Sequence, residues 1–125
     1  MMFSVFNKTK QETVALRGFF PESFSDRLRG MIGRDFSAFD GMIFDRCNAI
    51  HTFFMSIPLD IIFLSKEKKV LKTVTNFSPW MPFLYCKNAY YVIELPVGKI
   101  MTSKTAENDL FEWCPEFSAE REETV

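Results

Sequence analysis

The segment Asp60–Leu64 constrains the fold more than any other part of the sequence. After its first residue it is continuously apolar, which suits a strand that is covered on both faces. A carboxylate at the start of such a strand is costly to bury unless it accepts hydrogen bonds. We therefore expect Asp60 to fix the register of a central strand. The expected donors are backbone N–H groups near Pro58 or an arginine such as Arg46.

The rest of the sequence is typical of a mainly β protein. Short segments rich in β-branched and aromatic residues recur along the chain, with polar or proline-containing stretches between them. The expected strands are Met2–Thr9, Thr13–Phe20, Gly41–Asp45, Ala49–Met55, Leu59–Lys66, Val70–Asn76, Ala89–Leu95 and Asp109–Trp113. The first two strands are expected to form one hairpin, and Leu59–Leu64 is expected to form another with Val70–Thr75. In Ala89–Leu95, alternation places Glu94 on the face nearer solvent.

A change of period predicts one short amphipathic helix after Pro21. Its apolar positions recur at helical spacing and are Phe24, Leu28, Met31 and Ile32. Ser23 or Ser25 is suited to cap the start of the helix, and Gly33 to end it. A helical turn or an irregular connection is expected within Gly98–Asn108. The predicted fold is a compact β-sandwich or barrel-like domain with one or two short helices.

Chain length and composition favour a single domain. A chain of 125 residues with 47% hydrophobic side chains can bury one sizeable core, and two independently folding units are not expected. We expect one β domain over residues 1–114. Residues 115–125 are acidic with few apolar side chains, so they are expected to form a disordered tail.

The net charge and the cysteine content limit which partners and which cellular compartment are expected. The net charge of −1 gives no field that would attract a phosphate backbone, so nucleic acid is not an expected partner. No run approaches the roughly 18 to 20 apolar residues of a membrane span. The cysteines are Cys47, Cys86 and Cys114, an odd number that does not suit a disulfide framework. Together with an N-terminus that lacks a signal-peptide pattern, this predicts a cytoplasmic protein.

Several segments in a fixed order carry a family resemblance. The main one is the run Cys-Asn-Ala-Ile-His-Thr-Phe-Phe-Met-Ser-Ile-Pro-Leu-Asp-Ile-Ile-Phe-Leu at residues 47–64. The flanking segments are Ser25–Met31, Gly41–Phe44, Val70–Leu71, Pro79–Trp80 and Ala89–Gly98. Together they resemble DUF192, a bacterial and archaeal family of unknown function, over roughly Phe24–Trp113. The resemblance implies a compact, mainly β fold and no known activity.

Polar and aromatic groups within these segments outline a candidate ligand site. His51, Thr52, Asp60 and Trp80 are predicted to border a cleft that binds a small molecule or a protein segment. This site requires Ile50–Leu64 to be paired, extended backbone that brings the imidazole and the carboxylate to a shared edge. The predicted function is a non-enzymatic binding module without a cofactor.

An enzyme is the alternative function. Cys47 or Cys86 could act as a thiol nucleophile activated by His51, with Asp60 orienting the imidazole. The Cys-x3-His spacing of Cys47 and His51 also suggests a metal site. Residues four apart on a straight strand lie about 13 Å apart, however, which is too far for both to bind one ion. The CxxC pairs of strong zinc signatures are absent from the sequence, so no metal site is predicted.

The apolar, proline-containing segment Ser78–Lys87 is too hydrophobic for an idle surface loop. It is suited either to plug one end of the fold or to form the rim of an apolar pocket. A third functional possibility is a structural partner in an assembly, for which an exposed apolar patch would be the marker.

Overall fold

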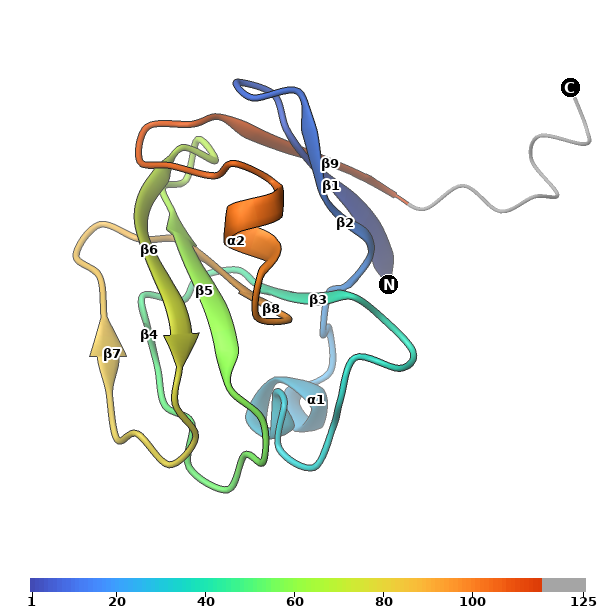
Figure 1. The fold of residues 1–125 in the computed structure, drawn as a ribbon. Helices are drawn as coiled ribbons and strands as arrows, with labels where there is room; N and C mark the ends of the chain where they lie inside the picture. The colour runs from blue at the N-terminus through green and yellow to red at the C-terminus, as the bar shows by residue number, and fades with distance from the viewer. Residues whose placement is uncertain (116–125) are drawn as a thin grey trace, which may run out of the picture.

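The computed structural model describes residues 1–115 (Figure 1). Within them lie nine strands and two short helices. In chain order these are β1 (Met2–Asn7), β2 (Glu12–Phe19), α1 (Phe24–Arg29), β3 (Gly41–Phe44), β4 (Ala49–Ile50), β5 (Leu59–Leu64), β6 (Val70–Phe77), β7 (Leu84–Tyr85), β8 (Tyr91–Leu95), α2 (Lys99–Thr102) and β9 (Phe111–Pro115). The predicted mainly β fold with one or two short helices is confirmed. The predicted tail lies outside the described residues, except for Pro115 at the end of β9.

Seven strands form one mixed sheet in the order β6-β5-β8-β3-β2-β1-β9. All neighbouring strands are antiparallel except β2 and β3, which are parallel. Both predicted hairpins are confirmed, as β1–β2 and β5–β6. Strand β5 lies inside the sheet and all six of its residues are buried, as its apolar sequence predicts. The short strands β4 and β7 form a separate antiparallel pair.

The sheet curves around α2, which lies between the β5–β6 and β1–β2 hairpins in Figure 1. A single bridge between Lys69 and Leu110 joins the chain just before β6 to the chain just before β9. The two outermost strands of the sheet therefore approach each other at one end.

The buried side chains form two clusters rather than the single core expected. The cluster on the α2 side contains Val5, Val14, Ala15, Ile43, Ile62, Leu64, Val70, Ile93, Leu95, Ile100 and Phe111. The second cluster contains Met31, Met42, Phe44, Met55, Leu59, Ile61, Phe63, Cys86 and Val92. Because successive residues of β5 and β8 point to opposite faces, these strands contribute to both clusters. A sheet that is apolar on both faces needs cover on both, and this divides the core.

Helix α1 is shorter than predicted, and its apolar face is not buried. Ser23 caps its start as expected, but Gly30, with φ of 51°, ends it after six residues. Phe24 and Leu28 remain 78% and 67% exposed, whereas Met31 is buried. The prediction of one packed helical face is wrong, because Met31 reaches the core from the turn that follows the helix.

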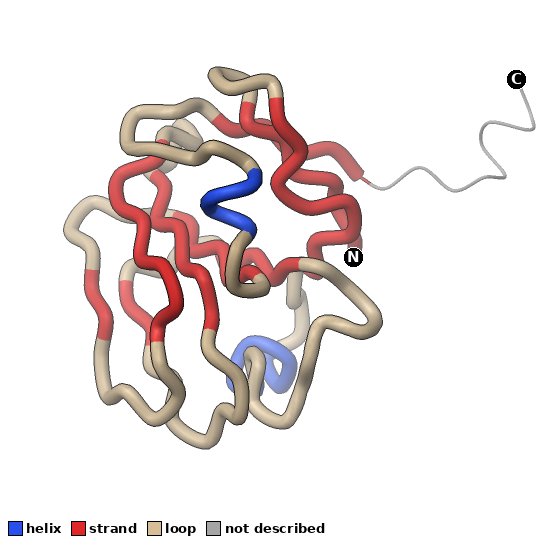
Figure 2. Tube along the Cα trace, in the orientation of Figure 1, coloured by secondary structure: helices blue, strands red, loops and turns tan. Residues whose placement is uncertain are grey.

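The predicted strand Ala49–Met55 ends at Ile50. Residues 51–58 form an irregular loop, drawn in tan at the lower end of the molecule in Figure 2. Within this loop Phe54 has φ of 64°, a left-handed conformation that a strand does not contain. The predicted extended backbone over Ile50–Leu64 is thus confirmed for β5 and wrong for the loop before it. No helix within residues 1–115 has the length and apolar character needed to cross a membrane.

Candidate functional site

A cleft of about 170 Å³ lies beside α1 on the face of the sheet that carries the second cluster. Its apolar lining comes from Leu28, Met31, Phe44, Ile50 and Met55. Its polar lining comes from Arg27, Arg29, Cys47, His51 and Glu94. A single water occupies about 10 to 15 Å³ by the same kind of measure. The cleft is therefore large enough for a small organic molecule.

Glu94 is the most unusual residue of this lining. Strand β8 pairs on both sides at this position, with Met42 of β3 and Ile61 of β5. Glu94 is 4% exposed, and its Oε2 atom has no hydrogen-bond partner among the described residues. Burial raises the pKa of the carboxyl from 4.5 to about 8. At neutral pH the group is therefore mostly a neutral acid, able both to donate and to accept a hydrogen bond.

The sequence-based placement of Glu94 near solvent is wrong. Alternation along β8 correctly puts Glu94 and Val92 on one face, but both are buried because α1, β4 and the loops around them cover that face. The sequence does contain a pattern that indicates a buried acid at this position. Glu94 interrupts an apolar strand in the same way as Asp60, so the argument made for a buried Asp60 applies to it equally.

His51 lines the mouth of the cleft from the loop after β4. Its Nδ1 atom accepts a hydrogen bond from the backbone N–H of Phe53 at 3.2 Å. In the neutral ring, that bond assigns the proton to Nε2. The ring also packs against the Phe53 ring with centroids 5.5 Å apart.

Two arginines of α1 supply positive charge at the cleft. Arg27 is fixed by Asp45, with Nη1 to Oδ1 at 2.8 Å and Nη2 to the backbone oxygen at 2.9 Å. Arg29 donates instead to the backbone oxygens of Ile32 and Gly33. Among the described residues no carboxylate forms an ion pair with Arg29.

The cysteines are unlike an activated nucleophile. The Cys47 thiol lines the cleft, donates to the Ala49 carbonyl oxygen at 3.3 Å, and has its pKa raised mainly by burial. Burial likewise raises the pKa of Cys86. Both thiols therefore remain protonated at neutral pH, whereas nucleophilic attack needs the thiolate.

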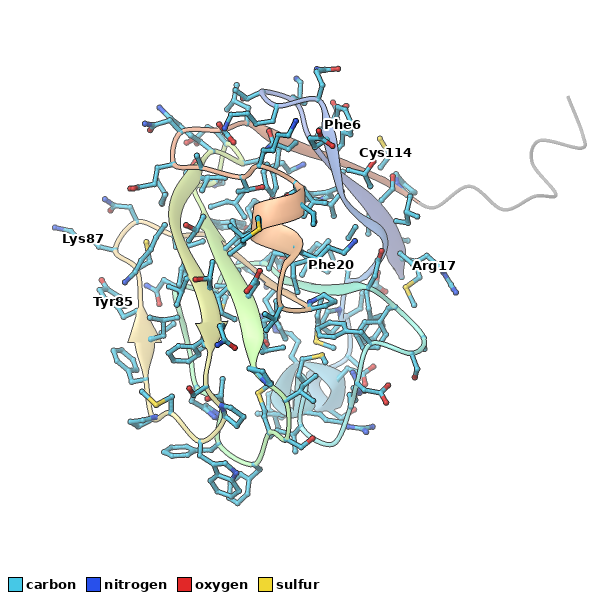
Figure 3. All side chains as sticks on the ribbon, in the orientation of Figure 1. Phe6, Arg17, Phe20, Tyr85, Lys87 and Cys114 are labelled. Carbon is cyan, nitrogen blue, oxygen red and sulfur yellow. The ribbon has the colours of Figure 1, made fainter. Side chains whose placement is uncertain are left out.

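The cysteines also do not converge on one point. Cys86 lies on the β7 side of the molecule, between Tyr85 and Lys87, and Cys114 lies on β9 at the opposite side (Figure 3). Within residues 1–115 no three His, Cys, Asp or Glu side chains are grouped so as to hold a metal ion.

Of the four predicted ligand residues, Asp60 is the one whose position differs most from the prediction. Its carboxylate accepts three backbone hydrogen bonds of 3.0 Å, from Asn76, Gly98 and Ile100. Backbone N–H donors are thus confirmed, but they come from β6 and the start of α2 rather than from the Pro58 turn or Arg46. Asp60 points to the α2 face of the sheet, and so it does not share an edge with His51. The carboxyl group that shares the cleft with His51 is Glu94.

Thr52 and Trp80 belong to two loops that are hydrogen-bonded together. The buried Thr52 exchanges backbone bonds with Trp80 and Met81, and its hydroxyl donates to the Ser78 oxygen at 2.7 Å and accepts from Met81 at 2.9 Å. A row of ring contacts leads from His51 through Phe53 and Phe54 to Trp80. The structure thus connects these three predicted residues, although only His51 lines the cleft. Their role in binding a ligand stays a prediction.

The curved mixed sheet, the two short helices and the cleft that contains Glu94 define a mainly β protein with a small-molecule-sized site. The chain belongs to the DUF192 family (Uncharacterized ACR), whose model matches residues 5–113. Among curated relatives, UPF0127 protein TK1120 of Thermococcus kodakarensis is 41% identical over 81 residues, which is 64% of this chain and 50% of that protein. UPF0127 protein PF1050 of Pyrococcus furiosus is 30% identical over 86% of this chain and 95% of its own length. The chain thus spans half of the first relative and nearly all of the second.

The fold also occurs in a solved structure. A protein of unknown function from Novosphingobium aromaticivorans matches with a TM-score of 0.74, covering 90% of this chain and 84% of its own. The two sequences are 22% identical, so this similarity establishes a shared fold.

Proposed function

We propose that this protein is a non-enzymatic binding module that takes a small, uncharged molecule into the cleft beside α1. The observation that carries the proposal is the Oε2 atom of Glu94, which is buried in the cleft lining and has no hydrogen-bond partner in the described part of the chain. An unsatisfied buried polar group lowers the stability of the protein by roughly 1 to 3 kcal/mol. A ligand that supplies the missing hydrogen bond recovers part of this cost, and this favours its binding.

The lining supports a specific kind of ligand. Most of the cleft is apolar, so the ligand is expected to have an apolar body. At its inner end it needs a carbonyl, hydroxyl or amide group, because the neutral Glu94 acid can donate to or accept from each of these. His51 is the second proposed polar contact, since it lines the same cleft.

The state of Cys47 supports binding rather than thiol chemistry. Its protonated thiol is engaged by the Ala49 carbonyl, and a thiol nucleophile would need the opposite change in pKa. We also propose a reducing, cytoplasmic compartment, supported by the free thiols of Cys47, Cys86 and Cys114. The net charge of −1 gives little attraction to a phosphate backbone, so we propose no nucleic-acid partner.

The proposal is tested by screening a library of small neutral fragments against ¹⁵N-labelled protein by NMR. We expect hits to shift the amides of Met31, Met55 and Glu94. A Glu94→Gln variant keeps a donor and an acceptor, so it is expected to bind the hits with similar affinity. A Glu94→Leu variant has neither, so its affinity is expected to fall by about tenfold or more.

A matched control is Leu16→Ser, which changes an exposed residue of β2 outside the cleft lining. Its affinity for the hits is expected to equal that of the unmodified protein. Hits that bind Glu94→Leu as tightly as the unmodified protein, or that shift amides outside the cleft, would contradict the proposal.

A further inference from the structure

Large apolar side chains are exposed together at one end of the molecule. We call loop residues 51–58 and 78–83 the aromatic tip. The two loops form the lower end of the molecule in Figure 2, and the hydrogen bonds of Thr52 hold them side by side. The exposed large side chains of the tip are Phe53, Phe54, Trp80, Met81 and Phe83, and Phe54, Trp80 and Phe83 are each more than half exposed. Monomeric proteins rarely expose so many grouped apolar side chains without a function.

The tip is a fixed structure and not a pair of loose loops. The Thr52 side chain is fully buried and joins the loops through both its backbone and its hydroxyl. Phe54 and Trp80 have φ of 64° and 62°, a region that large side chains rarely adopt. Such conformations persist only where the surrounding structure imposes them, and they occur often at functional sites. The fold thus holds two large rings outward against the preference of their own backbone.

The chain segments that form the tip contain no Asp, Glu, Lys or Arg, and charged side chains that share a pocket with tip residues, such as Arg34 and Asp35, come from α1 and the chain after it. Asp, Glu, Lys and Arg make up 25% of the chain, yet none occurs in residues 47–59 or in residues 73–86. Interfaces between proteins generally have a polar rim and are enriched in arginine. A hydrocarbon environment, by contrast, penalises every charged side chain and accepts Phe and Met, while Trp and Tyr are favoured at the boundary between lipid and water.

We infer that the aromatic tip inserts into the interfacial region of a phospholipid bilayer and docks the protein on a membrane surface. Phe53, Phe54 and Phe83 contribute apolar area, and the Trp80 indole N–H can remain at the headgroup level. Because the tip is already ordered, insertion does not have to order the loops first. The inference goes beyond the proposed function and does not depend on a ligand in the cleft.

Tryptophan fluorescence gives a direct measurement, because the chain has two tryptophans and only Trp80 lies in the tip. A Trp113→Phe variant makes Trp80 the sole reporter. We expect its emission to shift to shorter wavelength with vesicles of phosphatidylcholine, and to be quenched when the acyl chains carry bromine. The fraction of protein that floats with the vesicles is expected to be unchanged in about 0.5 M NaCl, since salt screens charge attraction and not apolar insertion.

A double variant, Phe54→Asn with Trp80→Asn, tests the tip itself. Asparagine tolerates positive φ better than most residues, so the loops are expected to keep their conformation. Affinity for phosphatidylcholine vesicles is expected to fall by about tenfold or more. Met101→Asn is the matched control, because Met101 is highly exposed on α2 outside the tip, and its affinity is expected to be unchanged. Circular dichroism of all variants verifies that they are folded.

Three results would overturn the inference. The first is a protein that does not float with any phosphatidylcholine vesicles. The second is flotation only with vesicles that contain phosphatidylglycerol and only at low salt, which indicates charge attraction. The third is a dimer in sedimentation equilibrium that the double variant abolishes, in the absence of vesicle binding, which makes a second copy the partner of the tip. Glu94→Leu is expected to leave vesicle binding unchanged, so failure of the cleft proposal is distinguishable from failure of this one.

Discussion

At the scale of single residues, two buried acids on adjacent strands show that burial alone does not set the hydrogen bonding of a carboxyl group. Asp60 is surrounded by three backbone N–H donors, whereas Glu94 has an oxygen without a hydrogen-bond partner within residues 1–115. They point to opposite faces of the sheet, so Asp60 holds β5, β6 and α2 together while Glu94 faces the cleft. The same sequence pattern therefore leads to a structural role in one case and to a candidate site in the other.

Glu94 should make stability fall as the pH rises. The pKa of Glu94 is about 8 in the folded protein, against an ordinary value of 4.5 that we take for the unfolded chain. The stability that the neutral acid contributes is therefore fully present below pH 4.5 and is lost as the pH rises through 8. The free energy of unfolding is expected to fall by at most on the order of 5 kcal/mol, because each tenfold change in an acid dissociation constant corresponds to about 1.4 kcal/mol. A Glu94→Gln variant is expected to lie within about 1 kcal/mol of the unmodified protein near pH 5, and to be the more stable of the two near pH 9.

Urea unfolding of both proteins measures this difference. Parallel stability curves for the two proteins between about pH 5 and about pH 9 would show that Glu94 is already ionised in the folded state.

At the scale of elements, Thr52 converts two apolar loops into one rigid unit. In a Thr52→Val variant the shape is retained, but the Ser78 oxygen and the Met81 N–H lose their partner. We expect the free energy of unfolding to fall by about 2 to 3 kcal/mol. We also expect the Met81 amide to exchange with deuterium faster, because its hydrogen bond is the one removed.

Thr73→Val is the matched control for this prediction, since Thr73 is a partly buried β6 residue whose side chain forms no hydrogen bond with the described residues. Its stability is expected to stay within about 0.5 kcal/mol of the unmodified protein. Equal stability of the two variants would mean that the Thr52 hydroxyl does not hold the tip.

The sequence predicts those elements whose partners are close in the chain. Hairpin β5–β6 is visible from the sequence because its strands are joined by the short polar connection at residues 65–69. The loop at residues 51–58 is not, because its conformation depends on bonds from Thr52 to residues 26 to 29 positions later. The apolar pattern there predicts a strand, and tertiary contacts override it. The cleft was only partly predictable for the same reason, since His51 and Glu94 meet only after β4 and β8 are placed.

At the scale of the whole molecule, a polar network ties the N-terminal hairpin to the segment before β9. The buried Asp109 accepts hydrogen bonds of 3.0 Å from Asn7, Lys10 and Ala106. Burial of Asp109 opposes its ionisation, but these three hydrogen bonds together hold the pKa of its carboxyl below the ordinary value of 3.8. The network lies at the end of the sheet where Lys69 and Leu110 form their bridge, so it helps to close the curve of the sheet.

Asp109 and Glu94 together predict where stability is greatest. The contribution of Asp109 is present above pH 3.8 and is lost as the pH falls through its lowered pKa, whereas that of Glu94 is lost as the pH rises from 4.5 through about 8. The maximum is therefore expected between about pH 4 and about pH 5, well below neutrality. Urea midpoints measured across the pH range are expected to fall less at acid pH in Asp109→Asn, and less at alkaline pH in Glu94→Gln, than in the unmodified protein. A maximum near pH 7 that neither substitution moves would show that surface charges, and not these two buried carboxyls, set the pH dependence of folding.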